Sequence, residues 1–311
     1  RGLAASTGTA NSRAPAVFEV GPDMPVARMG HHAATLADGS VALFGGHGQG
    51  FVSLASANFW TPGADTFSSR TMNQTRGTPI FTLLMDGRYL LAGGSSDLGV
   101  PAYAHSEIYD PVANSFTPSG NMVRFRSSSG STVLSDGRVL IAGAWWTHNE
   151  AHTYGELFDP TSGTYHAAGP FAKARSHAIV MPMDDGSGVV IGGVSPRGSF
   201  EDMPVEHYDP SDGVISTLQT LLFPGEPGWQ VRLGGRHTAA QRMGDGRFLW
   251  MATRAKGAVT QYRLFTFDPS DGSVEPLPML EDLPDSSTGY LMQVLVDAPR
   301  DRAYIIVLVP Q

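Results

Sequence analysis

The sequence contains no cysteine. The chain therefore forms no disulfide and holds no metal through thiolates. No apolar run approaches the roughly 20 residues that a membrane-spanning helix needs, so we expect no membrane insertion. Acidic residues outnumber basic ones, 29 to 21, which gives a net charge of −8. That balance argues against nucleic acid or an anionic membrane surface as a partner.

Recognisable leader and catalytic motifs are also missing. Residues 1–16 are small and polar, contain no hydrophobic core of a signal peptide, and begin with Arg rather than Met. We expect a flexible N-terminal segment over 1–16 of a processed or excised chain, followed by a single domain over 17–311. The sequence has no nucleophile elbow, no Walker loop and no metalloprotease motif, so no reaction is specified by motif.

Glycine and proline are plentiful, at 37 and 22 residues, and they fall into a repeat. An Asp-Gly pair recurs every 48 to 60 residues, at Asp38-Gly39, Asp86-Gly87, Asp136-Gly137, Asp185-Gly186 and Asp245-Gly246. Seven residues after each of these aspartates stands Gly45, Gly93, Gly143, Gly192 or, in the fifth copy, Ala252. Asp-Gly between β-rich runs predicts a tight hairpin, because glycine accepts a positive φ. The glycine-rich stretch 45–50 follows a strand but opens no helix, so it is not a phosphate loop.

A second turn completes each unit. Its pattern is an aromatic residue followed by Asp-Pro, at Tyr109-Asp110-Pro111, Phe158-Asp159-Pro160, Tyr208-Asp209-Pro210 and Phe267-Asp268-Pro269, with Trp60-Thr61-Pro62 as a degenerate copy. Asp-Pro suits the start of a type I turn. Each unit is therefore predicted to contain four short strands, a to d, with Asp-Gly between a and b and Asp-Pro between c and d. Such a sheet cannot bury both faces alone, so several must pack around a ring.

These residues together resemble Kelch repeats, in the bacterial form similar to the propeller of galactose oxidase. An Arg that precedes most copies (Arg28, Arg76, Arg126, Arg175 and Arg236) adds to the likeness. The resemblance implies an all-β, six-bladed Kelch-type β-propeller whose ring is closed by an N-terminal strand in the last blade. The blades are expected at about 24–69, 72–118, 122–167, 170–218, 223–277, and 279–311 plus 17–20. Galactose oxidase uses copper and a cysteine-crosslinked tyrosine, and a chain without cysteine cannot make that crosslink.

The loops from b to c and from d to the next a are expected on one face, which we treat as the ligand face. Recurrent residues there favour a structural role, and Glu107, Glu156 and Glu206 are expected to meet backbone or an Arg. Departures from the repeat favour function: the loop Trp145 to His152, and the long connection 221–235, which contains Trp229. The candidate ligand-binding residues are Trp145, Trp146, His148, His152, His47, Trp229, Arg232, Arg76 and Arg126.

No metal or other cofactor is expected. His148 and His152 flank Glu150 at the spacing of a zinc helix, but on a loop this spacing does not bring both rings to one side. The adjacent acidic pairs Glu201-Asp202 and Glu281-Asp282 are interpreted as solvated loop charges, because neighbours on a strand point to opposite faces.

Two functional classes remain open. The first is a noncatalytic module that recognises a glycan or a protein, with Trp side chains stacking on sugars or filling apolar pockets. The second is a carbohydrate-active enzyme, such as a sugar epimerase, mutarotase or lyase, with an Arg on a sugar carboxylate and a His as acid or base. Fold alone does not decide between them, and we favour recognition. The family resemblance implies an extracellular, periplasmic or cell-surface protein, and we expect a monomer.

Overall fold

The structure is a computed structural model and describes residues 21–95, 102–144, 153–195, 204–219, 240–256, 259–279, 291–297 and 302–308. Five sheets of four antiparallel strands follow one another along the chain. Blade 1 contains β1 (His32–Thr35), β2 (Val41–Phe44), β3 (Ser56–Trp60) and β4 (Ser68–Thr71). Blade 2 contains β5 (Ile80–Leu83), β6 (Tyr89–Ala92), β7 (His105–Asp110) and β8 (Ser115–Asn121).

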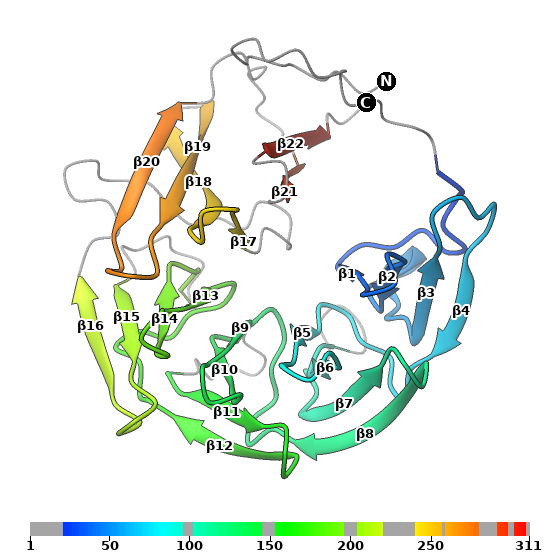
Figure 1. Cartoon of the computed structure of the whole chain (residues 1–311), viewed down its shortest axis with the longest axis horizontal. Coiled ribbons are helices and arrows are strands. Elements are labelled where there is room, and N and C mark those ends of the chain that lie inside the picture. Colours follow the sequence, from blue (N-terminus) through cyan, green and yellow to red (C-terminus); the bar gives the residue numbers. More distant parts are fainter. Residues whose placement is uncertain are drawn as a thin grey trace.

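The next three blades repeat this order. Blade 3 contains β9 (Gly130–Val133), β10 (Val139–Ala142), β11 (Gly155–Asp159) and β12 (Thr164–Ala168). Blade 4 contains β13 (Ile179–Pro182), β14 (Gly188–Ile191), β15 (Val205–Tyr208) and β16 (Ile215–Gln219). Blade 5 contains β17 (Gln241–Arg242), β18 (Phe248–Lys256), β19 (Val259–Phe267) and β20 (Val274–Met279). Figure 1 shows the sheets arranged around a ring, with the first strand of each nearest the centre. The all-β propeller fold is confirmed.

The predicted turns form as their residues require. Glycine of the Asp-Gly pair has a positive φ in every copy, from 83° at Gly39 to 92° at Gly246. In the Asp-Pro turns the aspartate caps the backbone, as where Asp159 Oδ1 accepts from the N–H of Thr161 at 2.8 Å. The glycine that ends strand b allows close packing between blades: a Cβ on Gly93 would lie 2.2 Å from the carbonyl oxygen of Arg126 in the next blade. No other residue type fits there.

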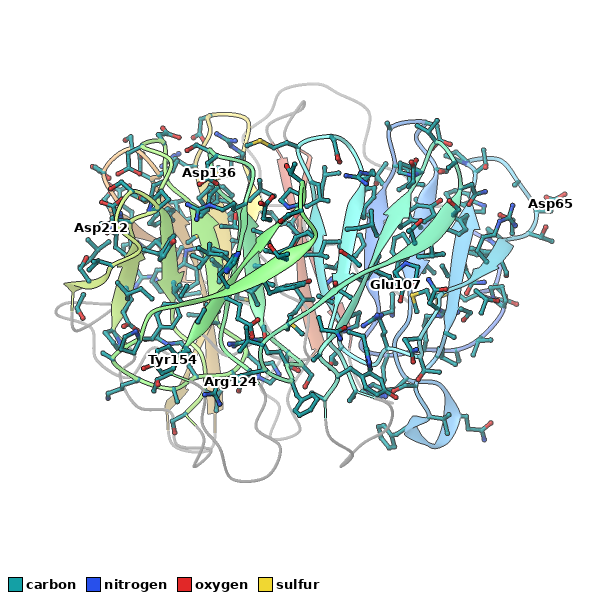
Figure 2. All side chains as sticks on the ribbon, turned by 90° about the horizontal axis from the view of Figure 1, so that it is seen from below. Asp65, Glu107, Arg124, Asp136, Tyr154 and Asp212 are labelled. Carbon is teal, nitrogen blue, oxygen red and sulfur yellow. The ribbon has the colours of Figure 1, made fainter. Side chains whose placement is uncertain are left out.

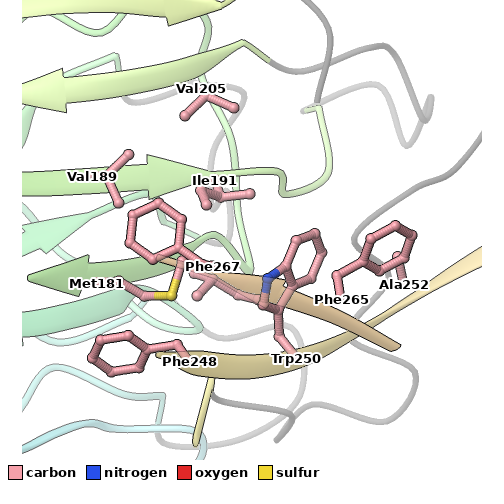
Figure 3. Close-up of a cluster of buried hydrophobic side chains, with 10 residues drawn as sticks. Met181, Val189, Ile191, Val205, Phe248, Trp250, Ala252, Phe265 and Phe267 are labelled. Carbon is pink, nitrogen blue, oxygen red and sulfur yellow. The ribbon is translucent and has the colours of Figure 1, made fainter. Parts of the chain in front are cut away.

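The hydrophobic core lies between neighbouring blades. Figure 3 shows one such cluster, in which Met181 and Ile191 of blade 4 meet Trp250, Phe265 and Phe267 of blade 5. The rings of Trp250 and Phe265 stack with their centroids 5.0 Å apart. Each blade thus buries its apolar side chains against the next, which explains why one repeat cannot fold alone.

The prediction of six blades is wrong for the part of the chain that the structure describes. After blade 5 only a two-stranded sheet follows, made of β21 (Leu291–Asp297) and β22 (Arg302–Leu308). Its two apolar runs are joined by a single turn, and neither the Asp-Gly nor the Asp-Pro pair of the other blades occurs in 279–311. The N-terminal strand expected at 17–20 lies outside the described residues. In the described ranges the structure also contains no helix long and apolar enough to cross a membrane.

Candidate functional site

The propeller has two chemically different faces. One carries the a–b and c–d turns and is called the turn face; the other carries the b–c and d–a connections and is called the loop face. The two kinds of turn meet between blades, where Nη2 of Arg138 donates to the carbonyl of Pro210 at 3.2 Å. Figure 2 views the disk from the side, with Asp136 and Asp212 toward one face and Arg124 and Tyr154 toward the opposite face.

The turn face is acidic, because nearly every turn contains an aspartate. These residues are Asp38, Asp65, Asp86, Asp110, Asp136, Asp159, Asp184, Asp185, Asp209, Asp212, Asp245, Asp268 and Asp271. Their role is local: a hydrogen bond from the Arg138 side chain lowers the pKa of Asp136 against the effect of its partial burial, and hydrogen bonds from Ser211 lower that of Asp209. We therefore assign these aspartates a structural role, the stabilisation of their own turns.

On the loop face three backbone hydrogen bonds join blades 1 to 4 in series. The N–H of Thr78 donates to Gly30 O at 3.1 Å, that of Ser128 to Thr78 O at 3.3 Å, and that of His177 to Ser128 O at 2.8 Å. Each of these four residues stands two positions after a repeat arginine and has a positive φ. A left-handed β-branched residue such as Thr78 is strained, and this inter-blade bonding is what holds it.

Three repeat arginines, Arg76, Arg126 and Arg175, form buried ion pairs two residues before the residues of this series. Nε of Arg76 donates to Glu107 Oε1 at 2.7 Å, and Nε of Arg126 donates to Glu156 Oε1 at 2.8 Å. Arg175 pairs with Glu206 through Nη2. All six side chains are buried. The same guanidinium groups also bond the carbonyl oxygen of the glycine that ends strand b, as Arg126 does with Gly143 at 2.9 Å.

The carboxylates of these pairs also receive a backbone N–H from the d–a connection. The donor stands three positions before the arginine in every case: Asn73 at 2.8 Å, Val123 at 2.6 Å and Ala172 at 2.6 Å. One carboxylate thus ties the incoming connection to strand c of the same blade. Glu107, Glu156 and Glu206 were expected to meet backbone or an Arg, and each of them meets both.

Blade 1 and blade 5 depart from this arrangement. Asn58 stands in blade 1 where the glutamate stands in blades 2 to 4, and it accepts from Nη2 of Arg28. Phe265 stands there in blade 5 and stacks on Trp250. Arg28 is partly exposed, whereas the other three described repeat arginines are buried.

His47 is buried at the contact between blades 1 and 2. Its Nδ1 lies 3.1 Å from Ser53 Oγ and 3.2 Å from the carbonyl oxygen of Phe51. Ser53 Oγ in turn donates to Ser95 O of blade 2 at 2.7 Å. The imidazole covers Gly77 so closely that a Cβ there would lie 1.9 Å from Cε1. His47 therefore has a structural role at the contact between blades 1 and 2, and its side chain is not open to a ligand.

Exposed apolar side chains gather on the loop face. They are Met24, Val26, Met29, Phe51, Val52, Val123, Phe125 and Tyr154, and together they are called the apolar rim. Phe51 belongs to the short η1 helix (Gln49–Phe51), and Val123 and Phe125 lie on the connection from blade 2 to blade 3. Phe125 is 58% exposed and Val52 57%. Several exposed apolar side chains on one face of a protein favour a surface that a partner or ligand covers.

The structure describes three of the nine predicted ligand residues, Arg76, Arg126 and His47, and all three are buried. The other six lie outside the described residues: Trp145, Trp146, His148, His152, Trp229 and Arg232. Sequence reasoning missed the apolar rim. A usable signal existed in Val123 and Phe125, because the matching positions of the preceding connection are the polar Asn73 and Thr75. Among the described residues no group of three or more His, Asp or Glu side chains is placed to hold a metal ion.

No protein-family model and no curated protein matches the chain. A solved structure of a fungal alcohol oxidase of the AA5 family, in complex with copper, is similar in fold, with a TM-score of 0.61 and 16% sequence identity. The likeness covers 89% of this chain and 59% of that one, so the chain spans under two thirds of that neighbour's length. At this identity the likeness shows the propeller fold alone.

Proposed function

We propose that this chain is a Kelch-type recognition module, noncatalytic, whose ligand is a segment of another protein bound across the loop face. The observation that carries the proposal is the apolar rim, in which Phe51, Val52, Val123 and Phe125 are each more than 40% exposed. Aromatic residues and methionine are enriched in protein interfaces, and burying such side chains supplies most of the binding free energy.

The state of the repeat arginines supports recognition over catalysis. A sugar-acid enzyme would need an arginine free to hold a substrate carboxylate beside a histidine. Arg76, Arg126 and Arg175 each hold an internal glutamate instead and are shielded from solvent. The Kelch assignment rests on the recurrent Arg, Asp-Gly, Gly-Gly and Asp-Pro positions, each of which has a mechanical role in the described blades. An extracellular, periplasmic or cell-surface site of action and a monomeric state complete the proposal.

The test is a selection on the wild-type protein with a phage-displayed random peptide library, run beside a glycan array. Ligands are then measured against a double variant, Phe51→Asn with Phe125→Ser, because asparagine tolerates the positive φ of Phe51. A matched variant, Leu83→Ser with Met85→Ser, removes exposed apolar side chains of the turn face.

The proposal expects peptides that lose at least tenfold in affinity for the loop-face variant and less than twofold for the turn-face variant. Selective binding of sugars, without any binding of peptides, would show that the ligand is a glycan and not a protein segment. Equal losses in both variants, with both folded, would overturn the assignment of the site to the loop face.

A further inference from the structure

Arg28 is the described repeat arginine without a carboxylate partner. Its Nη1 donates to Gly45 O at 3.0 Å and to Ser56 O at 3.1 Å, and its Nη2 donates to Ser56 Oγ at 2.9 Å and to Asn58 Oδ1. These acceptors are all neutral. Within the part of the chain that the structure describes, no Asp or Glu forms an ion pair with Arg28. The charge of this guanidinium is therefore not neutralised by any of the described side chains.

Two departures from the repeat occur together around Arg28. Blades 2 to 4 have a glutamate on strand c and a backbone N–H donor three positions before the arginine. Blade 1 has Asn58 at the first position and Pro25 at the second. Proline has no N–H to offer a carboxylate. Blade 1 has thus lost both the internal anion and one of the donors that would hold it.

One donor of Arg28 is also weakly used. Its Nε reaches only Val26 O, at 3.4 Å, which is longer than an ordinary N–H···O bond. In blades 2 and 3 the same atom bonds the glutamate at 2.7 and 2.8 Å. In blade 4, Nε of Arg175 makes a similar 3.5 Å contact with Lys173 O, but there Nη2 has its glutamate. Arg28 alone among these four combines a weakly used Nε with the absence of an internal carboxylate.

Exposed apolar side chains flank Arg28 on its own connection. They are Met24, Val26 and Met29, members of the apolar rim. The uncompensated charge also reaches His31, whose pKa is lowered by burial first and by the Arg28 charge second. An acidic ligand would meet attraction at Arg28 and repulsion from the aspartates of the turn face.

We propose that Arg28 receives a carboxylate of the bound partner, so that the ligand of the loop face is a peptide segment with an Asp or Glu flanked by apolar side chains. The ligand carboxylate accepts from Nε of Arg28, the donor that Glu107 and Glu156 engage on the arginines of blades 2 and 3. A partly buried guanidinium that gains a carboxylate forms a charge-assisted hydrogen bond of the stronger kind. This inference rests on the proposed recognition function and specifies the ligand class.

The repeat itself supplies the test. Asn58→Glu gives blade 1 the internal carboxylate of blades 2 to 4, whereas Asn58→Gln adds the same chain length without charge. The probe is a 12-residue peptide selected on the wild type, synthesised once with its Asp or Glu and once with Asn or Gln in its place. We expect Asn58→Glu to bind the acidic peptide at least tenfold more weakly than the wild type, and Asn58→Gln to bind it within about threefold. The amide peptide should bind all three proteins about equally.

The stability of each variant is followed by thermal unfolding, and Asn58→Glu should melt no lower than Asn58→Gln. Full affinity of folded Asn58→Glu for the acidic peptide would overturn the proposal. So would selected peptides without an acid, or acidic sugars as the only ligands. None of these results touches the loop-face assignment, which the Phe51 and Phe125 double variant tests separately on whichever ligand is found.

Discussion

The guanidinium of Arg126 donates through Nε to Glu156 Oε1 at 2.8 Å, and both side chains are buried. Burial lowers the pKa of Arg126 and the nearby Glu156 charge raises it again. The carboxylate also accepts from the N–H groups of Val123 and Arg124, at 2.6 and 3.1 Å. One carboxylate of β11 therefore satisfies three donors of the connection 123–126, and it fixes this connection to the blade that follows it.

Removing that carboxylate should be costly. Glu156→Gln keeps the shape but leaves the buried guanidinium without a counter-charge, and such changes cost about 3–5 kcal/mol. Urea unfolding monitored by tryptophan fluorescence measures the loss. Glu275→Gln, at an exposed position of β20, is the control and should change stability by less than about 0.5 kcal/mol. Equal effects of the two substitutions would show that the buried pair has no special role.

The exposed pairs of the turn face should contribute little. Arg138 Nη2 lies 2.6 Å from Asp136 Oδ2, but both side chains are more than a third exposed. Arg138→Gln should cost less than about 1 kcal/mol, and the difference should shrink in high salt. The measurement is the same urea unfolding at 0.05 and 1 M NaCl. A loss as large as that of Glu156→Gln would contradict the distinction between exposed and buried pairs.

Gly77 should tolerate no side chain, because His47 packs directly over it. The methyl group of Gly77→Ala would lie 1.9 Å from Cε1 of a buried imidazole. The ring would have to move and break its contacts with Ser53, so a loss of about 1–3 kcal/mol is expected. Gly21→Ala is the control, since nothing lies within 4 Å of its Cβ position. Unchanged thermal stability of Gly77→Ala would place the imidazole elsewhere.

His32 should make stability depend on pH in the acid range. Its ring stacks on Phe81 at 5.3 Å, and burial lowers its pKa from 6.5 to about 4. Between these values the unfolded chain takes up a proton that the folded chain does not, so stability falls as pH drops from 6.5 to about 4 and is independent of this group below. The contribution is up to about 3 kcal/mol.

The variant His32→Phe keeps an aromatic ring on Phe81 and removes the titrating group. Unfolding free energies of both proteins, measured from pH 7 to pH 4, give a difference curve in which the other titrating groups cancel. The wild type should lose stability relative to the variant as the pH falls. A flat difference curve would show that His32 has an ordinary pKa.

Much of the fold was predictable because turns are local. The Asp-Gly and Asp-Pro pairs fix backbone geometry within a few residues, and five copies at similar spacing specify five sheets. The two apolar runs after blade 5 do form strands, β21 and β22. The error lay in counting them as part of a sixth blade, since this unit carries neither the Asp-Gly nor the Asp-Pro pair that marks a four-stranded blade.

The site was less predictable for a physical reason. Arg76 and Arg126 are sequence matches of Arg28, and what separates them is the partner on strand c, some thirty residues later. Only the structure shows that Arg76 is paired with the carboxylate of Glu107 whereas Arg28 meets the neutral amide of Asn58. The exposure of Phe125 and Val123 likewise depends on which side of the connection faces the core. The local sequence does not predict that side.

The measurement that tests the central claim most directly is hydrogen exchange of the wild-type protein with and without a peptide selected on it. If the loop face is the recognition surface, the peptide should slow exchange in 24–29, 48–53 and 122–126, and leave the Asp-Gly turns at 38–39, 86–87 and 136–137 unchanged. Protection of those turns, with no change in the three loop-face segments, would contradict the account.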